Sequence, residues 1–154
     1  MSREAVVDQV AGILVRHEIK YATRDDGAEY LARFGSAGVY IGFADAGGGT
    51  VVIVRAPIVQ DLELDDAARQ RLLERLNELN AGSYYTRLYL HEKLVQAECD
   101  LPGEELQGAE LMNALGAVAR MADDLDDQLA AEFGGKTFES KWDETAPPEE
   151  AVDT

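Results

Sequence analysis

The sequence has little cysteine, few basic residues and no long apolar run. Cys99 is the one cysteine among 154 residues, which excludes an intrachain disulfide and a zinc site built on several cysteines. The longest apolar run, counting glycine, spans residues 37–44, whereas a membrane-spanning helix needs about 18 or more apolar residues. Lysine and arginine number 14 against 30 acidic residues, which gives a net charge of −16. Because this charge repels phosphate, we expect neither nucleic acid nor an anionic membrane as a partner.

The length and the N-terminal residues set the expected domain organisation and location. A chain of this size fits one domain, and it can bury enough surface for a core without disulfides or metals. Glu4 and Asp8 interrupt any apolar stretch of the signal-peptide kind, so we expect a cytoplasmic protein. Arginine outnumbers lysine by 10 to 4, and alanine and glycine are abundant, which favours a GC-rich bacterial source.

Hydrophobic periodicity predicts an α+β fold. Apolar residues at helical spacing predict helices over residues 2–17, 65–81 and 104–133. Alternating or continuous β-branched runs predict strands over residues 19–23, 38–43, 50–59, 84–90 and 93–100. A further segment, residues 28–34, fits either a strand or a helical turn. The predicted order is α-β-β-β-α-β-β-α, an antiparallel sheet of about five strands with the helices packed on it.

The last predicted helix carries an apolar seam, and a polar segment follows it. The seam runs from Leu111 to Leu129 at intervals of three and four residues. It packs either on the chain's own sheet or on a second copy of the chain, and the first arrangement is the commoner one. We assign residues 1–138 to one domain and residues 139–154 to an acidic tail without regular structure. One hypothesis is that Trp142 folds back from this tail onto the domain as an internal ligand.

An acidic run in the last helix supplies an enzymatic alternative. Asp123, Asp124 and Asp127 match the DDxxD spacing at which carboxylates share a magnesium ion that holds a diphosphate. Enzymes of that kind are larger and all-helical, and they carry a second metal motif that this sequence lacks. Leu125 belongs to the apolar seam, which directs the flanking aspartates toward solvent. A small enzyme, or a metal- or ligand-binding protein, that uses residues 123–127 stays open as the alternative function.

The other reactive groups give weak cases for catalysis. His17 ends the first predicted helix and His91 lies in a predicted turn, so the two imidazoles belong to separate elements. Cys99 alternates with apolar neighbours, as a small buried hydrophobe does. The glycines at 47–49 precede a strand and no lysine follows them, so they predict a hairpin loop and not a phosphate-binding loop. We therefore predict no enzyme, no metal site and no cofactor.

The predicted hairpin of residues 84–100 carries the candidate binding residues. A two-residue turn at His91 and Glu92 would place Leu88 opposite Val95 and form one apolar face that meets the helices. The other face carries side chains of the kinds enriched in protein interfaces. We select from it the candidate partner-binding residues Tyr85, Arg87, Tyr89 and Leu94. The alternative is that these side chains only cover a solvated sheet.

A family resemblance rests on the second predicted helix and its surroundings. Residues 72–80 read LLERLNELN, and their LNxLN core resembles the motif of the YbjN-like family. The apolar run VVIV at 51–54 precedes this helix, a tyrosine-rich hairpin follows it, and a long helix closes with FGG at 133–135. The resemblance covers residues 1–137.

The resemblance implies a binding module without catalytic residues. The YbjN-like family is similar in fold to the type III secretion chaperones, which are small, acidic and generally dimeric. Those chaperones hold an extended client segment without ATP. Asn77 and Asn80 match the family motif, and we expect them to serve the local backbone rather than a client. We therefore predict a non-enzymatic, chaperone-like or regulatory homodimer that binds a protein or peptide client, with charge that favours basic clients.

Overall fold

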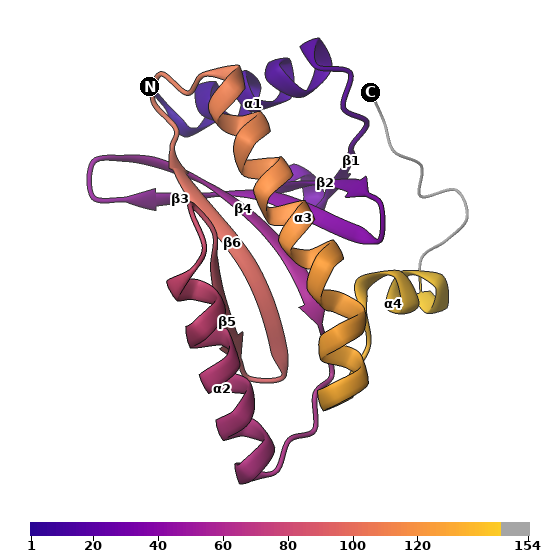
Figure 1. The fold of residues 1–154 in the computed structure, drawn as a ribbon. Helices are drawn as coiled ribbons and strands as arrows, with labels where there is room; N and C mark the ends of the chain where they lie inside the picture. Colours follow the sequence, from indigo (N-terminus) through magenta and orange to yellow (C-terminus); the bar gives the residue numbers. More distant parts are fainter. Residues whose placement is uncertain (146–154) are drawn as a thin grey trace.

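The computed structural model describes residues 1–145 as four α-helices and one antiparallel sheet of six strands in the order β1-β2-β3-β4-β6-β5 (Figure 1). The elements are α1 (Arg3–Arg16), β1 (Ala22–Arg24), the 3₁₀ turn η1 (Asp25–Gly27), β2 (Glu29–Phe34), β3 (Ala37–Ala46), β4 (Gly49–Val59), α2 (Asp66–Ala81), β5 (Arg87–His91), β6 (Leu94–Pro102), α3 (Gly108–Phe133) and α4 (Phe138–Thr145). Among these residues no helix combines the length and the apolar character that crossing a membrane requires. The predicted α+β class is confirmed, and so is the predicted order of the elements apart from one additional strand and one additional helix.

Side-chain caps explain where the first two helices begin. The hydroxyl of Ser2 accepts a hydrogen bond from the backbone N–H of Ala5 at 3.1 Å. Oδ1 of Asp65 accepts one from the N–H of Ala68 at 2.8 Å. Both bonds satisfy backbone donors that the first turn of a helix leaves free, so both predicted starts are confirmed.

The two faces of the sheet differ in chemistry. Residues directly opposite each other on antiparallel strands share a face. The face that we call the helix-side face is covered by α1 and α3 and includes the row Tyr30, Ile41, Val54 and Cys99 (Figure 1). The outer face includes the row Leu31, Tyr40, Arg55, Glu98 and Arg87. The apolar core therefore lies on one side of the sheet, and charged and aromatic side chains gather on the other.

The apolar seam of α3 packs on the chain's own sheet. Leu111, Leu115, Val118 and Leu129 are each 0% exposed and belong to the same core cluster as the buried residues of β3, β4 and β6. Burial of apolar surface at about 25 cal/mol per Å² is the main favourable term in such a core. Of the two arrangements open to the seam, the structure shows the intramolecular one.

Two details of the strands differ from the prediction. The ambiguous segment 28–34 forms β2, so the sheet has six strands and not about five. β4 is central, as its continuous apolar run predicts. On its helix-side face Val52 and Val54 are 0% exposed, whereas Val51 and Ile53 on the outer face are only half-buried. Helices therefore cover this part of β4 on one face only.

The start of α3 and the register of the last hairpin also differ. α3 begins at Gly108, four residues later than predicted, because Gln107 and Glu110 form a capping box there. The hairpin turn lies at Glu92 and Lys93, since His91 pairs with Leu94. Leu88 is therefore opposite Ala97 and not opposite Val95. This shift moves each partner by two residues, so every side chain keeps its predicted face.

Part of the predicted tail is helical. α4 covers residues 138–145, where the sequence analysis assigned no regular structure from residue 139 onward. Phe138 is 4% exposed and supplies the apolar contact that the acidic composition concealed. The backbone of Trp142 lies in α4, but its side chain and residues 146–154 lie outside what the structure describes. The hypothesis that Trp142 is an internal ligand therefore stays a prediction.

Candidate functional site

The structure does not bring the candidate residues Tyr85, Arg87, Tyr89 and Leu94 together in one patch. Tyr85 lies in the loop before β5 and is 87% exposed. Arg87 and Tyr89 lie side by side on the outer face. Leu94 lies near the hairpin turn, where it lines a separate outer-face pocket. Of these four residues, only Tyr85 is an exposed aromatic side chain of the kind that offers a partner a large contact area.

Arg87 and Tyr89 are engaged in a hydrogen-bond network. Arg87 pairs with Glu98 and donates from Nη1 to Asp100 at 2.9 Å. The hydroxyl of Tyr89 donates to Oε1 of Glu98 at 2.7 Å. Burial raises the pKa of Glu98, and the same cause raises the pKa of Tyr89. These side chains satisfy one another, which matches the alternative that they cover a sheet.

Asn80 fastens helix α2 to the edge strand β5. Its side-chain amide donates to the carbonyl of Leu88 at 2.9 Å, and its Oδ1 accepts from the N–H of Leu88 at 2.7 Å. These two bonds imitate a neighbouring strand and cover the edge of the sheet at this position. Asn77, the other asparagine of the motif, is exposed. Asn80 therefore bonds to the backbone of its own domain, and the backbone role of the motif stays a prediction.

The outer edge of β6 is open where β5 has ended. The N–H and C=O of Leu88 point to Asn80, away from β6. Backbone groups alternate in direction along a strand, so the N–H and C=O of Arg87 and of its partner Glu98 point toward each other. The N–H and C=O of Asp100, two residues after Glu98, point to the same side as those of Glu98. β5 begins at Arg87, opposite Glu98. In the part of the chain that the structure describes, no strand pairs with β6 on this side beyond that point. The backbone of Asp100 is therefore available to an added strand.

A strained turn at Tyr85 keeps this edge open. Tyr85 has a φ of 67°, which is rare for a bulky residue. The N–H of Thr86 donates to the carbonyl of Tyr84 at 2.7 Å, which makes a γ-turn centred on Tyr85. Continued as a strand, Tyr85 would lie opposite Asp100. Strained backbone of this kind concentrates at binding sites, where the surrounding structure holds it in place.

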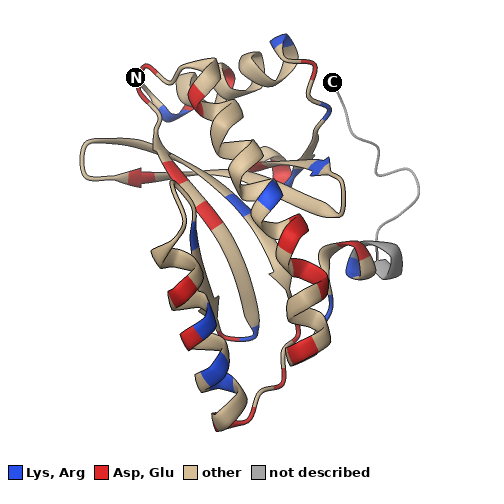
Figure 2. Ribbon diagram, viewed as in Figure 1, with Lys and Arg blue, Asp and Glu red and all other residues tan. Residues whose placement is uncertain are grey.

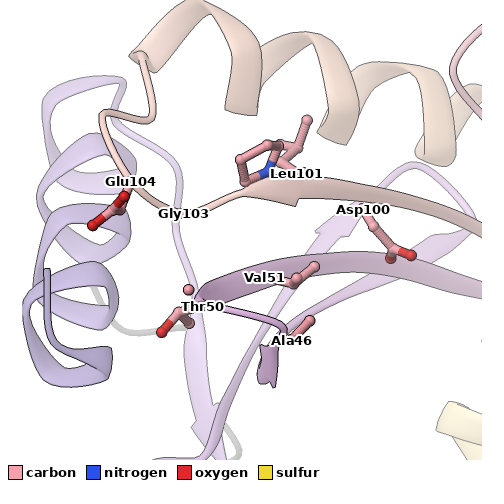
Figure 3. Close-up of a pocket in the computed structure, with 9 residues that line it drawn as sticks. Ala46, Thr50, Val51, Asp100, Leu101, Gly103 and Glu104 are labelled. Atoms are coloured by element: carbon pink, nitrogen blue, oxygen red, sulfur yellow. The ribbon is translucent and has the colours of Figure 1, made fainter.

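One pocket lies beside the open edge, and a second lies between the end of β6 and the β3–β4 hairpin. The helix-side pocket is about 220 Å³ and is lined by Tyr85, Cys99, Leu101, Glu110, Asn113 and Ala114. The end pocket is about 370 Å³ and is lined by Ala46, Gly49, Thr50, Val51, Asp100, Leu101, Pro102, Gly103 and Glu104 (Figure 3). Leu101 and Asp100 point to opposite sides of β6 in this view. A strand laid along this edge would therefore meet the helix-side pocket, and the end pocket lies across β6 from it.

The surroundings of the edge are acidic. Glu110 lines the helix-side pocket, and Asp100 and Glu104 line the end pocket. Figure 2 shows acidic residues on β6 and along the C-terminal half of α3. Burial raises the pKa of the Cys99 thiol, so this cysteine contributes apolar surface and not a nucleophilic thiolate. The site suits a ligand that carries both apolar and positively charged groups.

The acidic run of α3 holds a loop of the sheet. Ser36, between β2 and β3, donates from its hydroxyl to Asp123, and Oδ2 of Asp126 lies 2.6 Å from the same oxygen. Asp126 is only 5% exposed, so the prediction that all these aspartates face solvent is wrong. Among the described residues no group of three or more His, Cys, Asp or Glu side chains is arranged to hold a metal. The run therefore has a structural contact, and no feature of it favours the metal alternative.

A prediction of pH dependence follows from this contact. The hydroxyl of Ser36 has one proton and cannot donate to two ionised carboxylates at once. Burial raises the pKa of Asp126, whereas the hydrogen bond from Ser36 lowers the pKa of Asp123. A carboxyl whose pKa is raised by folding stabilises the protein below its unfolded pKa, and this contribution is lost as the pH rises through the folded pKa. Asp126→Asn should remove that loss and raise the melting temperature at neutral pH relative to the wild type.

Thermal unfolding of both proteins from about pH 4 to about pH 8 measures the difference. Asp124→Asn, a change at an exposed position of the same run, is the control. Parallel curves for wild type and Asp126→Asn would show that Asp126 does not titrate with folding.

The open edge does not follow from the predicted register of the hairpin. In the predicted register Tyr84 pairs with Cys99, so β5 covers most of β6. The observed register leaves residues 99–102 beyond the end of β5. The adjacent pair Tyr84 and Tyr85 is the sequence feature found at the point where β5 stops covering β6. In the structure these two side chains are 84% and 87% exposed.

Comparisons with known proteins agree with the fold and with a binding site on it. Residues 3–141 match the family model described as "T3SS (YopN, CesT) and YbjN peptide-binding chaperone 1". A solved structure titled "Structure of the HopA1-SchA Chaperone-Effector Complex" is similar with a TM-score of 0.57 and 16% identity, and the match covers 82% of this chain and 98% of that one. No curated protein matches the chain. The resemblance to YbjN-like proteins is confirmed, and the chain belongs to the family of T3SS and YbjN peptide-binding chaperones.

Proposed function

We propose that this chaperone holds its client as an added strand along the outer edge of β6. The observation that carries the proposal is the open section at Asp100, which lies beside the helix-side pocket. Peptides that add a strand to a sheet gain affinity from main-chain hydrogen bonds and specificity from pockets that receive alternate side chains. The geometry supports this mode of binding and requires no catalytic group.

The pockets define the kind of client segment that fits. On the helix side, Tyr85 and Ala114 border a pocket that suits an apolar side chain. Asp100, Glu104 and Glu110 place three carboxylates near the edge. Arg87 pairs with Asp100 and the N-terminal ammonium pairs with Glu104, so negative charge remains in excess. We therefore propose an extended client in which apolar and basic residues alternate.

Arg87 and Tyr89 belong to the proposed surface in a secondary role. Arg87 contacts Asp100 directly, so a client at the edge also lies beside this pair on the outer face. Leu94 marks the far end of the outer face, near the hairpin turn. Tyr85 is the candidate residue that we expect to contact the client most extensively.

A proline at the edge tests the proposal. Peptides of 12 residues selected from a random display library on the tagged protein serve as probes, and fluorescence anisotropy measures their Kd. Asp100→Pro removes the N–H that points away from the sheet, a position at which an edge strand tolerates proline. We expect it to weaken binding about fivefold relative to Asp100→Ala, because about 1 kcal/mol is lost with one hydrogen bond. Asp100→Ala is the matched control, since it removes the carboxylate and keeps the N–H.

The selected sequences give a second readout. We expect lysine or arginine to alternate with apolar residues in them. Equal Kd values for Asp100→Pro and Asp100→Ala, with melting temperatures that also agree, would contradict binding at this edge. Acidic consensus peptides would contradict the proposed charge preference.

We also propose that the protein is a cytoplasmic, regulatory homodimer, as the likeness to secretion chaperones implies. Size-exclusion chromatography with light scattering measures the mass of the purified protein. A mass of one chain, 16.8 kDa, at concentrations of tens of micromolar would contradict the dimer. The proposed client edge does not depend on this outcome, because it is formed within one chain.

A further inference from the structure

The end of the described chain lies against the outer face of the sheet. After α3, residue Lys136 forms a two-bond bridge with Gln60, each N–H donating to the other residue's carbonyl at 2.8 Å. A Cβ on Gly135 would lie 2.5 Å from the carbonyl oxygen of Gln60, so the close approach needs glycine. This bridge carries the chain past the end of β4 and places α4 on the face opposite α1 and α3.

Phe138 anchors α4 in a socket on that face. A Cβ on Gly38 would lie 2.2 Å from Cζ of Phe138, so the ring occupies the space that any other side chain would fill. The ring of Tyr40 meets the ring of Phe138 edge-on at 6.4 Å, and the guanidinium of Arg33 lies 5.8 Å from its centre. Gly38 and Tyr40 are two residues apart on β3 and so share the outer face. The socket is thus built for an aromatic side chain.

Two charge pairs set the position of α4 around this anchor. Glu139 pairs with Arg33 at 3.7 Å, and Lys141 pairs with Asp61 at 2.9 Å. These four side chains are between 31% and 54% exposed, and partly exposed pairs contribute little stability. A helix of 8 residues is also unstable by itself. Among the described side chains of α4, Phe138 therefore supplies the main apolar contact.

The socket continues into the outer-face pocket. This pocket is about 450 Å³, and Tyr40 belongs to both. Its lining includes Arg55, whose Nη2 donates to Glu29 at 2.9 Å, and Gln96. A segment longer than α4 can thus place an aromatic residue in the socket and polar residues in the pocket beside it.

We infer that α4 is a built-in ligand that occupies a second docking site, one for an aromatic-anchored peptide segment, on the outer face. The chain itself shows the ligand's pattern, an aromatic residue followed by an acidic residue and, two positions later, a basic one. The site is distinct from the edge of β6, and its occupant in trans competes with α4. The protein therefore binds such a segment only when Phe138 leaves the socket.

The test uses a fluorescent peptide with the sequence of residues 136–145, KTFESKWDET, and the full chain. Wild type should bind it weakly, because α4 fills the socket. Phe138→Ala should bind it at least tenfold more tightly, and the same peptide with alanine at the anchor position should not bind. Ser140→Ala, an exposed position on α4, is the matched control and should behave as wild type.

Gly38→Ala distinguishes an emptied socket from a loosened helix. It should release α4, seen as faster amide exchange over residues 138–145, and yet it should not bind the peptide, because its methyl group fills the floor of the socket. Should Phe138→Ala fail to fold, excess peptide added to wild type must itself speed the exchange of α4. No such change, or a folded Phe138→Ala protein that does not bind the peptide, overturns the inference.

Discussion

A Val118→Asp variant is expected to lack a folded domain. Val118 is 0% exposed in the middle of α3 and lies in the core cluster beneath the helix. A buried carboxylate without a partner costs several kcal/mol, and the change also removes a packed apolar side chain. A loss of about 5 kcal/mol or more is comparable with the whole stability of an ordinary domain.

Circular dichroism and a thermal melt measure this outcome. Gly116→Asp is the matched control: it adds the same charge to the same helix at an exposed position with open space around it. We expect that control to melt cooperatively within a few degrees of wild type. A Val118→Asp protein that is folded and monomeric would instead show that the seam is an interface between copies of the chain.

The sequence determines the local structure well because the signals are local. Ser2 and Asp65 cap helices through bonds that span three residues. The seam of α3 follows from spacing within one helix, and the two faces of the last hairpin follow from strand alternation. Each of these features depends on residues that are near one another in the sequence, so periodicity and cap chemistry are sufficient to predict them.

Register and long-range contacts could not be predicted in the same way. The turn at Glu92 and Lys93 involves no glycine, so composition did not mark its position. Asp126 is buried because Ser36, 90 residues earlier, reaches it. The Phe138 socket needs Gly38 on β3, and nothing in either segment alone indicates the other. The open edge of β6 results from the register between β5 and β6. Because the predicted register is different, the candidate residues chosen from it lie near the open edge but do not form it.

The change Asn80→Ala is expected to destabilise the domain by about 2–4 kcal/mol. The side chain of Asn80 makes two hydrogen bonds to Leu88, and its loss leaves an N–H and a C=O of a buried residue without partners. Each such group costs about 1–3 kcal/mol when it stays unsatisfied, and water at the sheet edge reduces the sum. Urea unfolding followed by fluorescence measures the change, and the slope of the transition should stay constant.

Asn77→Ala is the matched control, since Asn77 belongs to the same LNxLN motif but is exposed. Its effect should lie within about 0.5 kcal/mol of wild type. Asn80→Ala should also associate at high concentration, because the edge of β5 loses the group that imitates a neighbouring strand. A client peptide should bind the folded fraction of Asn80→Ala with unchanged Kd, since the edge at Asp100 is formed by β6. Loss of affinity without loss of stability would instead place Asn80 in contact with the client, and the motif would then be part of the binding site.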